Sequence, residues 1–326
     1  MIKIEDLTPP FNRVSVLMKG PCNYRCYYCY VDRSRLEGAS FGPFSTPKGA
    51  GKLVAMLDSM GKCSVNLVGE GEVMLLPNFI ELSNGIIQRH HLGITTNFSR
   101  PIEPFMEAVR PERVSSFVIS LHPEAERHLK SFKNKALKMK KAGYPITVIY
   151  VAHPLRIKNI PDLYRFFNRH NVVFKVAPFN GEFRRSIYPA SYKQKDIDFL
   201  LPYIVDPLSR YSLMGRIRFH TGKPCASGFS SFAIFEEDGR IQRCQDSPEI
   251  YGNVFTGDFT PLPGPRPCTS PFCHCDVCLE EQVFLRHYYR KFTTKKLQPV
   301  SEDAMVEYEK ICRPRNSVIR NPHGPV

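Results

Sequence analysis

The chain has 326 residues, 42% of them hydrophobic and 23% charged, which is typical of a globular protein of about two domains. No run approaches the ~18 apolar residues of a membrane span and no signal pattern opens the chain, so we expect a cytoplasmic protein without a membrane partner. The formal net charge of +14 raises nucleic acid as a partner. However, one basic block, Arg127–Lys141, has apolar residues at helical spacing, which is typical of a solvated helix face and argues against that partner.

Short β-rich runs alternate with helical patterns between residues 13 and 177. Strands are predicted at Arg13–Met18, Ser64–Val68, Leu92–Thr96, Ser116–Leu121, Ile146–Val151 and Val172–Ala177. Helices are predicted at Pro47–Met60, Asn78–His90, Ile102–Val109, Glu124–Ala142 and Asp162–His170. This alternation predicts an α/β fold with a parallel sheet and right-handed crossovers. Six such units would not close the usual eight-stranded barrel.

Three cysteines, Cys22, Cys26 and Cys29, follow the first strand with the spacing C-x3-C-x2-C. Clustered cysteines in a reducing compartment are typical metal ligands. Three thiolates can hold three irons of a cubane 4Fe–4S cluster and leave the fourth iron without a protein ligand. An open coordination position is where a metal centre does chemistry. Zinc normally takes four protein ligands in two pairs, so the triad favours iron.

Polar residues follow the next strands, at the edge where ligands gather in parallel α/β folds. They belong to Gly69-Glu70-Gly71-Glu72, Thr95-Thr96-Asn97 and Ser120-Leu121-His122. His122 is a candidate catalytic acid or base because histidine titrates near neutral pH, although a plain loop histidine before Pro123 is the alternative. His153, after the fifth strand, has the same two interpretations. Cys63 precedes the second strand and is expected to be a small buried apolar residue.

After Pro178 the alternation ends. A further helix is predicted near Tyr192–Val205, and Ser231–Phe235 with Arg240–Cys244 forms a predicted hairpin. The metal candidates in this part are Cys225, Cys244, Cys268, Cys273, Cys275 and Cys278. We expect one cluster held by Cys225, Cys244 and two of the later four, with two clusters or a zinc site as alternatives. Cys312 could supply a further ligand, although a lone cysteine in the tail is more often free.

The first cysteine motif, with Tyr28 directly before Cys29, resembles that of the radical S-adenosylmethionine (radical SAM) superfamily. The later cysteines, with G-x4-C from Gly239 to Cys244, look like a SPASM or shorter twitch extension. The resemblance implies a partial (β/α)6 barrel in residues 10–205, a small cysteine-rich auxiliary cluster domain in 206–285, and a basic helix and tail in 286–326. Two departures stand out. Gly69-Glu70-Gly71-Glu72-Val73 differs from the family's Gly-Gly-Glu-Pro, and C-x4-C-x-C-x2-C differs from the SPASM spacing.

The resemblance also implies cofactors. A 4Fe–4S cluster would bind S-adenosylmethionine at its open iron and cleave it to a 5′-deoxyadenosyl radical, which takes a hydrogen atom from the substrate. An auxiliary 4Fe–4S cluster would lie in the extension. The implied cofactor-binding residues are Tyr28, Gly71, Glu72, Thr96, Asn97 and Ser120. Gly71 and Glu72 would hold the methionine ammonium, and the polar strand ends would bind the ribose and the carboxylate.

The implied partners are a flavodoxin or ferredoxin type electron donor and one of two substrates. The first is a ribosomally made peptide that is oxidised, cross-linked or epimerised, and the second is a small carbohydrate or cyclitol. A zinc-dependent nucleic-acid-binding protein is the alternative that is not an enzyme. Its basic C-terminal segment would stack bases on Tyr288 and Tyr289.

Overall fold

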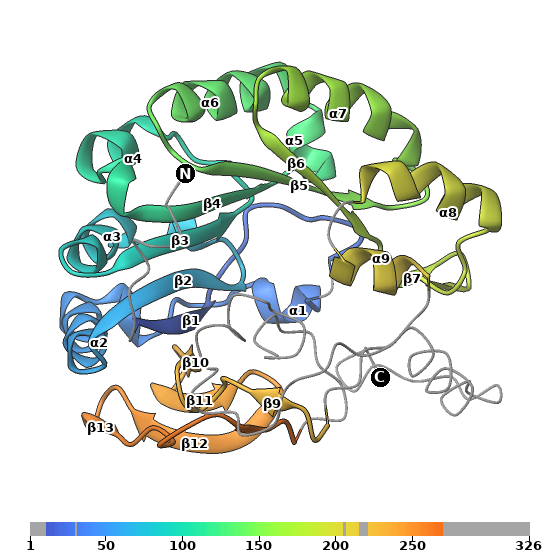
Figure 1. Cartoon of the computed structure of the whole chain (residues 1–326). Coiled ribbons are helices and arrows are strands. Elements are labelled where there is room, and N and C mark those ends of the chain that lie inside the picture. The colour runs from blue at the N-terminus through green and yellow to red at the C-terminus, as the bar shows by residue number, and fades with distance from the viewer. Residues whose placement is uncertain (1–10, 30, 205–206, 215–220, 270–326) are drawn as a thin grey trace.

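The computed structural model describes residues 11–29, 31–204, 207–214 and 221–269 (Figure 1). Its main feature is a ten-stranded sheet with the order β13-β12-β11-β10-β1-β2-β3-β4-β5-β6. The parallel strands are β1 (Phe11–Lys19), β2 (Lys62–Glu70), β3 (His91–Thr96), β4 (Val114–Ser120), β5 (Ile146–Ala152) and β6 (Val173–Pro178). All six predicted strands are confirmed, and so is the parallel α/β fold.

Helices cover the outer side of the curved sheet, as Figure 1 shows for α2, α3, α4, α6 and α7. The helices are α1 (Arg33–Leu36), α2 (Pro47–Ser59), α3 (Phe79–Ile87), α4 (Glu103–Ala108), α5 (Pro123–Glu126), α6 (Leu129–Lys141), α7 (Ile160–Arg169), α8 (Gln194–Leu200) and α9 (Pro207–Leu213). Strand side chains alternate between buried and half-buried, as in β5. Leu57 and Ile86 pack with Val16 and Ile94 in the core. None of the described helices combines the length and apolar character that a membrane span needs.

The helix predicted at Glu124–Ala142 is in fact two helices. Its lysine-rich part is confirmed as α6, with Phe132, Ala136 and Met139 buried. The break lies at His128, whose φ of −122° and ψ of 37° are not helical. Apolar periodicity could not reveal this break because α5 is oriented by polar contacts, with Glu124 on Cys26 and Glu126 on Arg156.

The helix predicted near Tyr192–Val205 is shorter than expected. It consists of α8 and a 3-10 turn at Leu201–Tyr203, and Val205 lies outside the described residues. Tyr192 precedes the helix and is buried, because its hydroxyl donates to the Ala152 carbonyl at 2.6 Å and accepts from the Phe179 amide at 2.9 Å. These bonds fix the chain beside the end of β5. A hairpin of β7 (Gly181–Phe183) and β8 (Ser186–Tyr188) lies between β6 and α8.

The C-terminal strands extend the barrel sheet. The predicted hairpin is confirmed as β10 (Ser231–Phe235) and β11 (Arg240–Cys244), and it is followed by β12 (Ser247–Asn253) and β13 (Asp258–Phe259). β10 pairs in parallel with β1, from Arg13 with Ser231 to Leu17 with Phe235. A separate two-stranded sheet joins β9 (Pro224–Cys225) to β14 (Arg266–Pro267). The cysteine-bearing extension therefore continues the barrel sheet through β10, orange in Figure 1.

Candidate metal and cofactor site

The cysteine motif lies in the loop that directly follows β1. Cys26 is buried, Cys22 is half-buried and Cys29 is exposed. The Cys29 amide donates to the Cys26 carbonyl at 3.1 Å, which closes a turn between these two cysteines. The Cys26 thiol donates to Glu124 Oε2 at 3.2 Å, and Asn97 Nδ2 lies 3.7 Å from Cys22 Sγ. The loop therefore presents three thiols at the carboxyl edge of the sheet.

The electrostatics of this loop fit a metal cluster. Burial raises the pKa of Cys22, and burial together with Glu124 raises the pKa of Cys26. Negative charge on Cys29 raises the pKa of both thiols, and Cys22 also raises the pKa of Cys26, so these thiols lie within electrostatic reach of one another. Among the described residues no three His, Cys, Asp or Glu side chains converge on a single metal ion. Each ligand of a cubane binds a different iron, so a cluster does not need its three thiols to converge on one ion.

Gly71 allows the loop after β2 to approach the cysteine loop closely. Its φ is +104°, and a Cβ placed there would lie 2.3 Å from the Gly20 carbonyl oxygen. Only glycine adopts this conformation without strain. The next residue, Glu72, donates its amide to the Pro21 carbonyl at 3.0 Å. The Gly-Glu pair predicted from the sequence is therefore fixed directly beside the cysteines.

The carboxylate of Glu72 is buried and strongly hydrogen-bonded. Its Oε1 accepts from the Met74 amide at 2.9 Å and from Thr96 Oγ1 at 2.5 Å, and its Oε2 accepts from the Asn97 amide at 2.6 Å. Burial raises the pKa of Glu72, although these hydrogen bonds act in the opposite direction. No cationic side chain in the described part of the chain forms an ion pair with it. A bound cation, such as an ammonium group, would compensate its charge.

The ends of β3 and β4 complete this side of the site. Asn97 Nδ2 donates to Asn23 Oδ1 at 3.0 Å, and Ser99 Oγ donates to the same oxygen at 3.1 Å. These bonds tie the end of β3 to the cysteine loop. Ser120 is the last residue of β4 and is half-buried. The structure thus brings Glu72, Thr96 and Asn97 together with the cysteines, and Ser120 lies at the same edge of the sheet.

Tyr28 and His122 form a half-buried polar pair on the other side of the loop. The Tyr28 hydroxyl lies 2.9 Å from His122 Nδ1, and Arg156 Nη1 donates to the same hydroxyl at 2.8 Å. Burial, aided by Arg156, lowers the pKa of His122 to about 4. His122 is therefore neutral at pH 7. Because the Tyr28 oxygen already accepts from Arg156, its proton is available to Nδ1 of His122.

Arg156 is a functional candidate that the sequence did not reveal. It is 4% exposed, and it donates to Leu121 O at 2.7 Å and to Glu126 Oε2 at 3.0 Å. It thereby joins the ends of β4 and β5 to Tyr28 in the cysteine loop. Arginine is usually exposed, and Glu126 falls in a segment predicted as a solvated helix, so neither residue gave a signal.

Aromatic rings enclose Tyr28. It stacks on His153 with a centroid distance of 5.9 Å, and His153 contacts Phe179 at 4.7 Å and Phe183 at 4.5 Å. Burial and Arg156 lower the pKa of His153 to about 4. His153 therefore lies in an apolar wall of the site in its neutral form.

The later cysteines form a second group. Cys225 ends β9, Cys244 ends β11 and Cys268 follows β14 directly. Burial raises the pKa of Cys244 to about 11, with further contributions from Asp246, Cys225 and Cys268. Cys273, Cys275, Cys278 and Cys312 lie outside the described residues, as do Tyr288 and Tyr289. Cys63 is fully buried and its thiol contacts the Leu57 and Gly61 carbonyls, so the prediction of a buried residue is confirmed.

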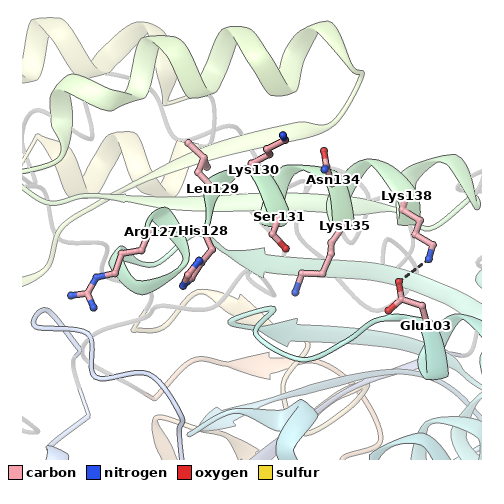
Figure 2. Close-up of a pocket in the computed structure, with 9 residues that line it drawn as sticks. All are labelled: Glu103, Arg127, His128, Leu129, Lys130, Ser131, Asn134, Lys135 and Lys138. Carbon is pink, nitrogen blue, oxygen red and sulfur yellow. Dashed lines mark hydrogen bonds and ion pairs between the residues drawn. The ribbon is translucent and has the colours of Figure 1, made fainter.

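A surface cavity lies between α4 and α6, and no cysteine lines it (Figure 2). Basic side chains of α6 line much of it, and Lys138 pairs with Glu103 at 2.7 Å. Lys135 Nζ donates to the carbonyls of Phe98 at 2.5 Å and Arg100 at 3.2 Å. The cavity contains none of the strand-end residues above, so it is not the candidate site.

Comparison with known proteins agrees with this geometry. Residues 20–167 match the model of the radical SAM superfamily. The matching stretch contains the cysteine loop, Glu72 and the ends of β3, β4 and β5. The family match therefore agrees, over this part of the chain, with the resemblance inferred from the motif.

Two solved structures have a similar fold. The structure of anSMEcpe with bound AdoMet aligns with a TM-score of 0.52 and 18% identity, over 75% of this chain and 78% of that one. SuiB of Streptococcus suis bound to the precursor peptide SuiA aligns with a TM-score of 0.52 and 14% identity, over 76% of this chain and 63% of SuiB. This chain therefore matches less than two thirds of SuiB. The search of curated proteins found no match.

Proposed function

We propose that this chain is a radical SAM enzyme that abstracts a hydrogen atom from a ribosomally made peptide and so oxidises, cross-links or epimerises it. The observation that carries the proposal is the placement of three thiols beside the buried carboxylate of Glu72. When bound, a 4Fe–4S cluster supplies the electron that breaks the sulfonium of S-adenosylmethionine and releases the hydrogen-abstracting radical. The residues of the chain supply binding, orientation and exclusion of water.

Cys22, Cys26 and Cys29 would hold three irons. Metal ligation requires thiolates, so the proton of Cys26 has to leave before iron binds. Glu124 Oε2, 3.2 Å from that sulfur, is positioned to take the proton. In this proposal Glu124 acts while the cluster is being assembled and not during catalysis. Once iron is bound to Cys26, the Glu124 carboxyl would turn away from the sulfur.

The residues predicted to bind S-adenosylmethionine would have different roles. Glu72 would compensate the methionine ammonium, with Gly71 giving it a close approach to the cysteine loop. The Thr96 hydroxyl and the Asn97 amide already donate to Glu72, so they would orient this carboxylate. The Asn97 side chain and Ser120 would bind the polar groups of the ribose and the carboxylate.

Tyr28, His122 and His153 would form a wall of the site that excludes water. Arg156 and Tyr28 hold His122 as a neutral hydrogen-bond acceptor at Nδ1. With a pKa of about 4, His122 would act as a base rather than an acid in any proton transfer. The aromatic packing around His153 would exclude water from a reactive intermediate.

The peptide substrate is supported by fold likeness to SuiB, which was solved with the precursor peptide SuiA. An auxiliary 4Fe–4S cluster would use Cys225, Cys244 and two of the four later cysteines, and would accept an electron from the substrate. A reduced flavodoxin or ferredoxin type protein would supply the electron for each cleavage.

The test is the formation of 5′-deoxyadenosine by anaerobically reconstituted, dithionite-reduced protein. Wild type is expected to form it, Cys26→Ala is expected to form none, and Cys63→Ala is the matched control because its thiol lies outside the site. Product formed by Cys26→Ala at the wild-type rate contradicts the proposal. Adding short precursor peptides and sugars to the wild-type reaction then separates the two substrate classes.

A further inference from the structure

Arg243 is an unusual residue of the C-terminal extension because its side chain is 2% exposed. A buried charge is costly unless hydrogen bonds and an opposite charge compensate it. Arg243 lies on β11 directly before Cys244. Its environment therefore bears on the cysteine that follows it.

The guanidinium of Arg243 joins separate segments of the chain. Nε donates to the Ser227 carbonyl at 3.2 Å, and Nη2 donates to the carbonyls of Arg266 at 3.2 Å and Pro267 at 2.7 Å. Nη1 donates to Glu249 Oε1 at 3.0 Å. These bonds satisfy the buried charge and join the β9 loop, β12 and β14 to β11.

Each of the segments that Arg243 bonds through a carbonyl carries a cysteine. Ser227 follows Cys225 by two residues, and Pro267 directly precedes Cys268. Cys225 is also paired with Arg266 between β9 and β14, and the Cys268 amide donates to the Lys223 carbonyl at 2.8 Å. The guanidinium therefore fixes the backbone positions of Cys225, Cys244 and Cys268 together.

An unpaired polar group next to Cys225 is consistent with a bound group at these cysteines, and a glycine makes room for Arg243. The Ser227 hydroxyl is buried and has no hydrogen-bond partner within the described residues, while the Ser227 amide donates to Cys225 Sγ at 3.4 Å. Gly228 has a φ of +85°, and a Cβ there would lie 3.2 Å from Arg243 Cγ. Glycine thus leaves room for the arginine, and the unpaired Ser227 hydroxyl belongs to the residue whose amide donates to Cys225 Sγ.

We propose that Arg243 is a positioning residue that presents Cys225, Cys244 and Cys268 as three ligands of the auxiliary iron–sulfur cluster. The inference rests on the proposed function and narrows the ligand set, since Cys268 becomes one of the two later ligands. Arginine suits this task because its planar fork of donors reaches several carbonyls at once, which the single ammonium of lysine cannot do.

The test compares Arg243→Met and Arg243→Lys with Arg240→Met as the matched control. Arg240 lies on the same strand, but its guanidinium pairs with Asp238 at 2.6 Å at the surface. Each protein is reconstituted anaerobically, and its iron and sulfide are counted and its clusters identified by Mössbauer spectroscopy. Both Arg243 variants are expected to lose the iron of one cluster and to retain the other cluster and S-adenosylmethionine cleavage. Arg240→Met is expected to keep both clusters.

Wild-type iron content in either Arg243 variant overturns the proposal. Loss of both clusters together also overturns it, because that result assigns Arg243 a general structural role. If Arg243→Met does not fold, the iron content of Arg243→Lys alone tests the proposal. Lysine keeps the positive charge but lacks the planar guanidinium that donates to several carbonyls. The proposed function is tested separately by Cys26→Ala. A wild type without the N-terminal cluster refutes that function, whereas a C-terminal site that binds zinc instead of iron refutes only the present inference.

Discussion

Glu236 provides a test of how the C-terminal extension is joined to the barrel. It is fully buried, and its Oε2 accepts from the Lys19 amide at 2.7 Å, at the end of β1. Burial raises its pKa from 4.5 to about 7, although the Lys19 amide acts in the opposite direction. One pKa unit corresponds to ~1.36 kcal/mol, so ionised Glu236 destabilises the fold by about 3 kcal/mol at high pH.

The sign of the effect follows from this raised pKa. Below pH 4.5 the carboxyl is protonated in both the folded and the unfolded chain, and its full contribution to stability is present. Between pH 4.5 and about 7 the folded chain holds the proton more tightly, so stability falls as the pH rises. Above pH 7 the loss is complete. Glu236→Gln, which cannot ionise and keeps an acceptor for the Lys19 amide, should remove this pH dependence.

The assay is urea unfolding of the metal-free protein at several pH values from 5 to 8. Glu236→Gln is expected to be more stable than wild type at pH 8, by about 3 kcal/mol at most, and to approach wild type at pH 5. Glu237→Gln is the control, because Glu237 is exposed and its ion pair with Lys19 should contribute less than about 0.5 kcal/mol. An unchanged pH dependence in Glu236→Gln would refute the reasoning.

Three further substitutions test the site and its surroundings. Arg156→Met leaves Glu126 and the Leu121 carbonyl without their partner and should cost about 3–5 kcal/mol in urea unfolding; a loss below 1 kcal/mol would show that the network is not structural. Glu72→Gln should weaken S-adenosylmethionine binding to the iron-loaded protein at least about tenfold in equilibrium dialysis, whereas the nearby Glu70→Gln should have little effect. Equal losses of affinity in the two variants would contradict a contact between Glu72 and the methionine ammonium. Arg184 and Arg185, at the β7–β8 turn, both have positive φ. Replacing them by Asn and Gly should therefore raise the melting temperature, by an amount corresponding to about 1 kcal/mol. A decrease would contradict the strain assigned to this turn.

The barrel could be predicted from the sequence because its signals are local. Alternating apolar residues in β5 and the helical spacing of Phe132, Ala136 and Met139 each reflect one face packed against the core. The polar residues at the ends of β2, β3 and β4 could then be placed at one edge, because parallel strands share that edge. For this reason the sequence alone places Glu72, Thr96 and Asn97 at one edge, where the structure has Glu72 bonded to the other two residues.

The remaining features depend on contacts between distant segments. The pairing of β10 with β1 joins residues more than two hundred positions apart, and no periodicity encodes it. The break between α5 and α6 depends on Cys26 and Arg156, which lie outside that helix. Arg156 and Arg243 are buried only because carbonyls of other loops surround them. A charged residue gives no sequence signal of such an environment.

The central claim is that the loop after β1 holds a 4Fe–4S cluster with an iron open to S-adenosylmethionine. The most direct measurement is electron paramagnetic resonance of the reduced protein with and without S-adenosylmethionine. It is made in a Cys225→Ala/Cys244→Ala background, which would remove the signal of the proposed auxiliary cluster. The account predicts a 4Fe–4S spectrum whose g values shift when S-adenosylmethionine is added. A spectrum that does not change, or a protein without iron in this background, would contradict it.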